Sequence, residues 1–371
     1  MENPTLNDDI RTILKGFYGV LKAEDANLKF VFLTGVTKFS KVSIFSDLNQ
    51  LIDISLEKQF ASVCGISEAE LLQNFQPEMQ ALAKENNLTY DEAFAELKKR
   101  YDGYHFAKVS DDIYNPFSVL KTLRNLDFAY YWFETGTPTF LAKALRKQHY
   151  DIRQLENDVW IDEPSIMDYR VENQDLIPLL YQTGYLTIKS YKTGLYILGF
   201  PNEEVKYGFL KELLPAFVLT PIQTGNFSVV KFMRQMQQGD IEGFMTSLKA
   251  FFAAIPYDAM EQKKQDEQYF QHVFYLLFTL IGEFVQTEVK NNIGRADAVV
   301  KTADSIYVFE FKINNSLSGG EGRGATTAEA ALAQINSRDY AIPYTTDHRR
   351  LVKIGVEFSQ TERGVKRWLI E

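Results

Sequence analysis

The spacing of apolar and polar residues predicts a mixed α/β chain whose front part is mainly helical. Apolar residues between Ile10 and Leu21 recur at helical spacing, and the short run Phe30–Leu33 ends at a turn signal. This pattern favours an amphipathic helix followed by a buried, parallel strand. Within residues 66–100, two Ser/Thr caps followed by acidic residues open further helices, because such residues satisfy the free amides of a first helical turn.

A helix followed by a hairpin is predicted for residues 174–200. The stretch "DLIPLLYQTG" has helical spacing, and "YLTIKSYKTGLYILGF" alternates around a Lys-Thr-Gly turn. This order of elements is that of a winged helix-turn-helix module. The clear cations of the hairpin are Lys189 and Lys192, so a packing or partner surface is favoured over a contact with DNA.

The tail of the chain has the pattern helix, strand, strand, loop, helix and strand. Such alternation is typical of an α/β unit. We expect these helices and strands at 261–286, 296–300, 306–310, 327–341 and 351–358.

Composition narrows the class of protein. The chain has 371 residues and a net charge of −9, which argues against a protein that coats nucleic acid non-specifically. One cysteine, Cys64, and four histidines without metal-ligand spacing argue against a disulfide framework and a zinc hydrolase. The N-terminus lacks a signal-peptide pattern, and the longest apolar run, Val273–Gly282, is too short to span a bilayer. We therefore expect a cytoplasmic protein without a membrane partner.

Three charged residues interrupt the apolar strands of "GRADAVVKTADSIYVFEFK", residues 294–312. Glu310 and Lys312 project from one face of their strand, because side chains alternate along it. If the two strands pair antiparallel, Asp297 lies near Glu310, and the two carboxylates raise each other's pKa unless a cation joins them. Two acids that hold Mg²⁺ or Mn²⁺, with Lys312 to orient water and offset phosphate charge, suit hydrolysis of a phosphodiester. The alternative is a hairpin whose terminal charges are only solvated.

The same segment resembles the PD-(D/E)XK nuclease superfamily, in which an acid on one strand precedes (D/E)-x-K on the next. "GRADAVV" and "IYVFEFK" are similar to the RecB-like branch, although Ala296 replaces the proline of the nominal signature. The resemblance implies a restriction-endonuclease-like α/β domain over 261–371. It also implies that Asp297 and Glu310 are metal ligands and that Lys312 is the catalytic lysine.

The resemblance further implies an accessory acid and a helix that carries Gln and Tyr toward the site. Glu267, on the apolar side of its predicted helix, is the first candidate metal ligand, and Glu288 competes with it; a solvated surface charge is the alternative for each. "AEAALAQINSRDY" supplies Gln334 as a catalytic residue, with an exposed polar position as the alternative, and Tyr340 follows at a longer spacing than is usual in the branch.

The loop "GGEGRGAT", residues 319–326, matches the phosphate-binding pattern GxxxxGK[ST] at every fixed position but one. Ala325 stands in the place of the lysine that would contact the β- and γ-phosphates. ATP binding is therefore not expected there, and a loop that closes on substrate through Arg323 is favoured.

The first two hundred residues resemble a bacterial family in which an AAA-ATPase-like region precedes a PD-(D/E)XK domain. The resemblance rests on "LKFVFLTGVTKFSKVSIFSDLNQLIDIS", "RYDGYHF", "YNPFSVL", "YWFETGTPTFL", "LYQTGYLTI" and "LGFPNEEV". In the family the Walker A loop and the Walker B strand precede this point, and this sequence contains neither. We therefore expect an ATPase remnant over 1–60, a helical region with a winged-helix-like module over 61–225, a helical linker over 226–260, and no ATP site.

Three functions follow from these patterns. The first is a metal-dependent nuclease on an ATPase-derived scaffold, with DNA favoured as its substrate and RNA as the alternative. The second is a non-catalytic module with a relic nuclease fold that binds nucleic acid or, through the ATPase-like front part, a protein partner. The third is an ATPase subunit that needs another chain for its phosphate site.

Overall fold

The chain folds into two compact units, each with its own core. The computed structural model describes residues 4–35, 51–135, 139–148, 150–156, 159–167, 176–218, 222–255, 267–282, 286–289, 297–314, 326–359, 362 and 364–371. The first unit comprises Met1–Thr137 with Gln154–Gly208, and the second comprises Pro138–Arg153 with Phe209–Glu371. No helix that these described residues form is long and apolar enough to cross a membrane.

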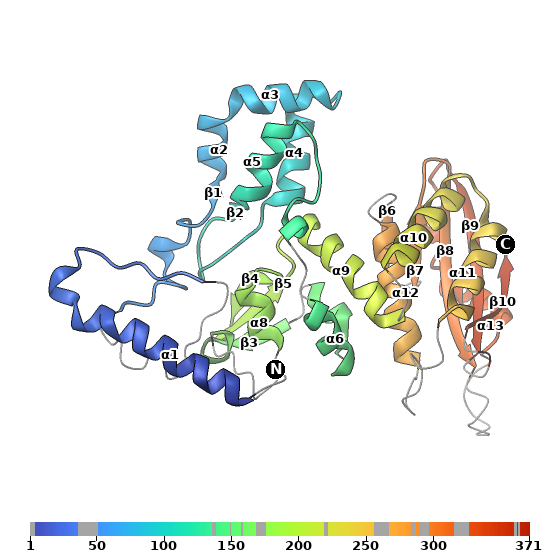
Figure 1. Ribbon diagram of the computed structural model, residues 1–371. Helices are drawn as coiled ribbons and strands as arrows, with labels where there is room; N and C mark the ends of the chain where they lie inside the picture. The colour runs from blue at the N-terminus through green and yellow to red at the C-terminus, as the bar shows by residue number, and fades with distance from the viewer. Residues whose placement is uncertain are drawn as a thin grey trace. The chain divides into compact units, whose positions relative to one another are not determined.

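The amphipathic helix predicted near the N-terminus is confirmed as α1, Pro4–Ala23, which is drawn in blue in Figure 1. The strand predicted after it is wrong, because residues 30–35 form no strand and Phe30 is 80% exposed. An extended segment becomes a strand only when a neighbouring strand completes its backbone hydrogen bonds. None of the strands formed by the described residues pairs with this segment.

Four helices build the core of the first unit. Two of them open with the predicted capping boxes, Ser67 with Glu70 and Thr89 with Glu92. Their apolar faces share one cluster that includes Leu71, Leu97 and Tyr101. The elements are α2 (Glu68–Asn74), α3 (Gln76–Glu85), α4 (Tyr90–Tyr101) and α5 (Pro116–Asn125), with the antiparallel pair β1 (Ile66–Ser67) and β2 (Ile113–Tyr114).

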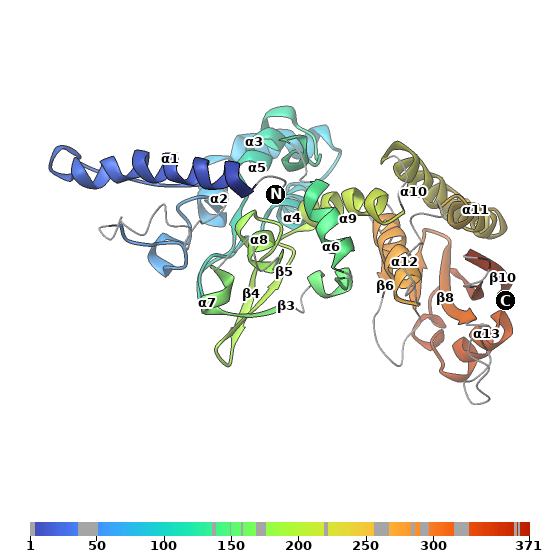
Figure 2. The same ribbon diagram turned by 60° about the horizontal axis from the view of Figure 1, so that its bottom comes forward.

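The predicted helix and hairpin of residues 174–200 are confirmed in a small module of the first unit (Figure 2). Thr193 and Gly194 form the tip of the hairpin with φ of 52° and 88°, the left-handed conformation that a two-residue hairpin turn needs. The three strands pair in the order β3-β5-β4. The elements are β3 (Val159–Asp162), α7 (Glu163–Ile166), α8 (Leu176–Gln182), β4 (Thr187–Lys192) and β5 (Leu195–Gly199).

The second unit is built around a five-stranded sheet. Its strands run in the order β10-β9-β8-β7-β6, with β8 and β9 parallel and the other pairs antiparallel. The predicted hairpin, helix and last strand are confirmed, while β6 and β10 are not apparent from the pattern, because edge strands are short and carry polar residues. The elements are β6 (Gln286–Val289), β7 (Ala298–Lys301), β8 (Ser305–Asn314), α13 (Ala328–Ser337), β9 (Arg350–Ser359) and β10 (Gly364–Ile370).

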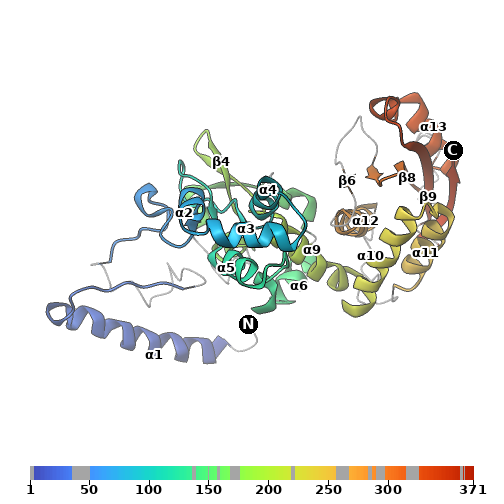
Figure 3. The same cartoon turned by 90° about the horizontal axis from the view of Figure 1, so that it is seen from above.

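Helices cover both faces of this sheet, with α13 on one side and α10 to α12 on the other (Figure 3). The ring of Phe244 in α11 lies 5.9 Å from that of Phe309 in β8, so the helices expected to form a linker pack on the sheet instead. Gly355 lets α13 approach β9, because a Cβ there would meet the Ala328 carbonyl and the Leu332 amide. The other helices are α6 (Thr139–Lys147), α9 (Glu203–Val218), α10 (Ile222–Gln237), α11 (Ile241–Ala253) and α12 (Glu267–Ile281), and short 3₁₀ turns are η1 (Asp25–Asn27), η2 (Lys58–Phe60), η3 (Trp132–Thr135), η4 (Ile152–Glu156) and η7 (Ile342–Tyr344).

Candidate active site

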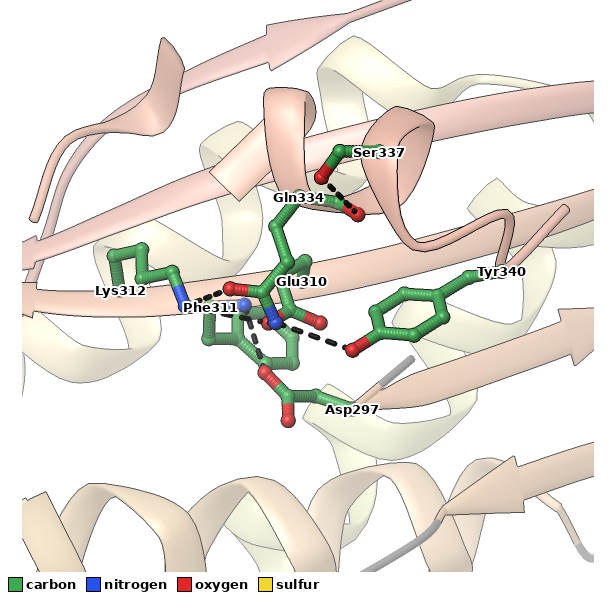
Figure 4. Close-up of polar contacts among 7 residues, drawn as sticks. All are labelled: Asp297, Glu310, Phe311, Lys312, Gln334, Ser337 and Tyr340. Carbon is green, nitrogen blue, oxygen red and sulfur yellow. Dashed lines mark hydrogen bonds and ion pairs between the residues drawn. The ribbon is translucent and has the colours of Figure 1, made fainter. Parts of the chain in front are cut away.

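Asp297 and Glu310 lie opposite each other at one end of the β7–β8 hairpin. The pairing of Ala298 with Phe309 confirms the predicted antiparallel register, and one further step along it sets Asp297 across from Glu310. Asp297 Oδ2 accepts a hydrogen bond of 2.9 Å from the backbone N of Phe311 (Figure 4). This bond fixes the Asp297 carboxylate against the partner strand.

Glu310 is a buried acid, with 3% of its surface exposed. Burial, reinforced by the negative charge of Asp297 and opposed by the ammonium of Lys312, raises its pKa to about 7. Its Oε2 atom is buried and has no hydrogen-bond partner among the described residues. An acid in this environment favours either a proton or a bound cation at neutral pH.

Lys312 and Gln334 converge on Glu310, as Figure 4 shows. Lys312 Nζ lies 3.4 Å from Glu310 Oε1 and donates a hydrogen bond of 2.5 Å to Gln334 Oε1. Gln334 Nε2 in turn donates to Glu310 Oε1 and, over 3.2 Å, contacts the hydroxyl of Tyr340. The side-chain amide of Gln334 therefore bonds to both Glu310 and Lys312. Tyr340 joins this hydrogen-bonded cluster although it lies farther along the sequence from Gln334 than is usual in the branch.

Replacing Glu310 with Gln raises the free energy of unfolding above neutral pH. The folded-state pKa of about 7 exceeds the ordinary value of 4.5, so the stability that this group contributes is present below 4.5 and is lost as pH rises through 7. Gln stays neutral, and we expect a gain of about 1 to 3 kcal/mol at about pH 8 in metal-free buffer, with little gain at about pH 5. Urea unfolding at the two pH values measures the difference in the free energy of unfolding between the variant and the wild type. An equal difference at both pH values would contradict the raised pKa of Glu310.

The side chains of some predicted site residues lie outside the part of the chain that the structure describes. Glu267 opens α12 and Glu288 lies on β6 beside Val299, but both side chains fall outside the described part of the chain. The loop residues Arg323 and Ala325 also lie outside it. The choice between Glu267 and Glu288 as an accessory ligand therefore stays a prediction.

Glu357 is a buried acid of the same face that the sequence pattern did not single out. It lies beside Lys312 in the parallel register of β8 and β9, and 3% of its surface is exposed. Its Oε1 atom lies 2.8 Å from Nζ of Lys366. The sequence feature that could have indicated Glu357 is a charged residue between the apolar residues Val356 and Phe358 of a predicted strand.

The two carboxylates suit a hard divalent cation. Among the described residues there is no group of three or more His, Cys, Asp or Glu placed to hold a metal. Mg²⁺ often takes only one or two carboxylates and keeps several waters. Asp297 and Glu310 therefore fit Mg²⁺ or Mn²⁺, since the cation would meet the unpaired Oε2 atom of Glu310 and relieve the repulsion between the two acids.

Comparison with known proteins agrees with the fold of the C-terminal part. Residues 265–368 match the family model of the PD-(D/E)XK nuclease superfamily, and residues 1–45 match that of a predicted AAA-ATPase. The chain is 32% identical over 381 residues to "Uncharacterized protein in vnfD 5'region" from Azotobacter chroococcum mcd 1, an alignment that covers 100% of this chain and 69% of that protein. The comparison with solved structures found no match.

The C-terminal part of the chain is thus a domain of the PD-(D/E)XK nuclease superfamily. The chain belongs to the bacterial AAA-ATPase-like family that carries this domain at its C-terminus.

Proposed function

We propose that this protein is a metal-dependent nuclease that hydrolyses phosphodiester bonds, with DNA as the favoured substrate and RNA as the alternative. The observation that carries the proposal is the pair of carboxylates, Asp297 and Glu310, facing each other across β7 and β8, with Lys312 and Gln334 bonded to the buried one. Membership of the nuclease superfamily supports the same reaction class.

Each residue of the site has a distinct role in the proposed reaction. Asp297 and Glu310 would hold Mg²⁺ or Mn²⁺, which when bound supplies the charge that activates water and neutralises the phosphate. The water loses a proton to solvent as its oxygen bonds to phosphorus, and the bond to the leaving oxygen breaks while that oxygen takes up a proton from solvent. The ammonium of Lys312 stabilises the negative charge that develops on the phosphate. Gln334 keeps Glu310 and Lys312 in their relative positions through its two hydrogen bonds.

Cleavage by the purified full chain tests the proposal. We expect single-stranded or double-stranded DNA to be cut with Mg²⁺ or Mn²⁺ and to remain intact with EDTA, because the proposed reaction needs the cation to activate water and to neutralise the phosphate. Labelled DNA and RNA on a denaturing gel distinguish the substrate classes. If neither nucleic acid is cut with either metal, the nuclease assignment fails and a relic nuclease fold that only binds takes its place.

The winged-helix-like module is proposed as a packing element rather than a DNA reader. Helix α8, which precedes the hairpin, is buried along most of its length, including Leu179, Leu180 and Tyr181. Lys189 is exposed, but its Nζ is held against the module by a hydrogen bond that it donates to the Pro201 carbonyl over 3.0 Å. A helix that reads bases must present polar side chains to a groove, so we assign nucleic-acid contact to the C-terminal domain.

A protein partner is proposed for the ATPase-like front part. Helix α1 exposes Ile13 and Phe17, and the following segment exposes Phe30. Large apolar side chains exposed along one helix face, such as Ile13 and Phe17, mark an interaction surface. Because residues 1–45 match a predicted AAA-ATPase, the partner we propose is a chain that supplies the phosphate-binding part of such a domain. ATP hydrolysis by this chain alone is not expected, since the sequence contains no GxxxxGK[ST].

A further inference from the structure

A row of alternating charges continues from the candidate active site to the last strand of the sheet. Glu357 lies beside Lys312 in the β8–β9 register and beside Arg367 in the β9–β10 register. All three share the face that α13 covers, where Arg367 also pairs with Glu329 of that helix. Glu357 is buried, and a buried carboxylate is costly unless cations surround it. Lys366 supplies such a cation at 2.8 Å.

A β-bulge brings Lys366 to this acid. The register of β10 against β9 shifts between Val365 and Arg367, so Lys366 is the extra residue of the strand. Bulges redirect side chains and are frequent next to active sites. The Lys366 carbonyl accepts a hydrogen bond from Nζ of Lys249 over 3.3 Å. The Lys366 side chain remains 43% exposed while that of Glu357 is 4% exposed, so a buried acid holds an ammonium that solvent can reach.

We propose that Lys366, held in place by Glu357, binds a backbone phosphate of the nucleic-acid strand whose scissile phosphate sits at Glu310 and Lys312. Two strand spacings separate β8 from β10, about 10 Å in all. That distance equals about three nucleotides of a DNA strand at about 3.4 Å each. The contact rests on the proposed nuclease function and extends it by giving the substrate strand a direction across the sheet, from β8 toward β10.

Glu357 acts as a positioning residue in this arrangement. Its negative charge weakens the attraction of the site for a phosphate, so electrostatics alone gives no reason for it. A free lysine side chain loses rotamer entropy when a ligand fixes it. An acid that already fixes Lys366 reduces that cost at the moment of binding.

Binding of DNA in the absence of metal tests the contact. The probe is a fluorescein-labelled DNA hairpin with a single-stranded tail, titrated with the full chain in EDTA at several salt concentrations. Lys366→Gln removes the charge, and its amide still donates to Glu357, so the fold is kept; circular dichroism checks this. We expect about three- to tenfold weaker binding and a decrease of about one in the slope of log K against log salt.

The matched control is Lys98→Gln, which removes another exposed lysine that is paired with a glutamate, here Glu68 in the first unit. It should leave the affinity unchanged. An equal loss in both variants, or no loss in Lys366→Gln, would overturn the phosphate contact.

Glu357→Gln separates positioning from charge. Losing a negative charge near a phosphate should tighten binding if charge alone acts, whereas losing the group that fixes Lys366 should weaken it. We expect weaker binding; tighter binding would overturn the positioning role.

Cleavage assays on the same proteins separate this inference from the nuclease proposal. Weaker binding in Lys366→Gln, with no cleavage by the wild type, would refute the nuclease and leave the phosphate contact standing. Cleavage by the wild type with an unchanged KM in Lys366→Gln would overturn the contact alone.

Discussion

We expect Lys312→Ala to lower the rate of the proposed cleavage by about a hundredfold to a thousandfold while fold and metal affinity are retained. The ammonium lies 3.4 Å from Oε1 of Glu310, the buried acid of the site. Without it, the negative charge that builds on the phosphate in the transition state has one fewer compensating charge. Single-turnover cleavage at saturating Mg²⁺ measures the effect on the chemical step.

The control for this variant is Lys353→Ala. Lys353 lies on the same face of the sheet, pairs with Glu371 at 2.9 Å and has a side-chain exposure of 24%, against 26% for Lys312. Its removal changes the net charge equally and should leave the rate unchanged. A similar loss in both variants would show that general charge, and not the position of Lys312, drives catalysis.

Asp297→Asn lowers the affinity for Mn²⁺ by at least about tenfold, because it removes one of the two anionic ligands of the proposed site. The amide of Asn cannot replace the charge that balances the cation beside Glu310. Calorimetric titration of the full chain with Mn²⁺ measures the affinity. Asp304→Asn is the control, since Asp304 is an exposed residue in the turn at the other end of the same hairpin. Equal affinity of the wild type and Asp297→Asn for Mn²⁺ would show that the metal does not bind at this hairpin.

The same titration carries a pH dependence that is specific to Glu310. Its pKa of about 7 means that the acid is protonated below neutral pH in the metal-free protein. A cation must displace that proton, so the apparent metal affinity should fall by up to about tenfold for each pH unit below 7 and level off above it. Binding should also release a proton near neutral pH, seen as a dependence of the calorimetric enthalpy on the buffer. Affinity that is flat between about pH 5 and pH 8 would indicate that Glu310 is not a ligand.

The stability of the metal-free protein and its proposed chemistry oppose each other at Glu310. Burial and the charge of Asp297 raise the pKa of this carboxyl, which destabilises the fold above neutral pH and prepares the group for a cation. Glu310→Gln should therefore be more stable and inactive. Such an exchange of stability for function is typical of catalytic sites.

Much of the C-terminal domain was predictable from local pattern. Side chains of a strand point alternately to its two faces, so the shared face of Glu310 and Lys312 follows from their positions in β8. The turn between the strands then sets Asp297 across from Glu310. These predictions succeed because strand periodicity and hairpin register are short-range properties, decided by residues that are close in the sequence.

The front part shows where local pattern fails. The run Phe30–Leu33 has the composition of a buried strand, yet residues 30–35 form none. A strand is completed by hydrogen bonds to another strand, and no property of the four residues reveals whether that neighbour is present. Edge strands β6 and β10 were missed for the converse reason, since their pairing comes from β7 and β9 and not from their own apolar content.

The sequence by itself determined the residue types of the candidate site and the faces on which Asp297, Glu310 and Lys312 lie. Only the tertiary structure decided that Gln334 of α13 reaches Glu310, that Glu357 and Lys366 extend the row of charges, and that burial raises the pKa of Glu310 to about 7. Side-chain direction along a strand depends on neighbours in the chain. Burial, and contact between separate elements, depend on how helices and strands far apart in the sequence pack together.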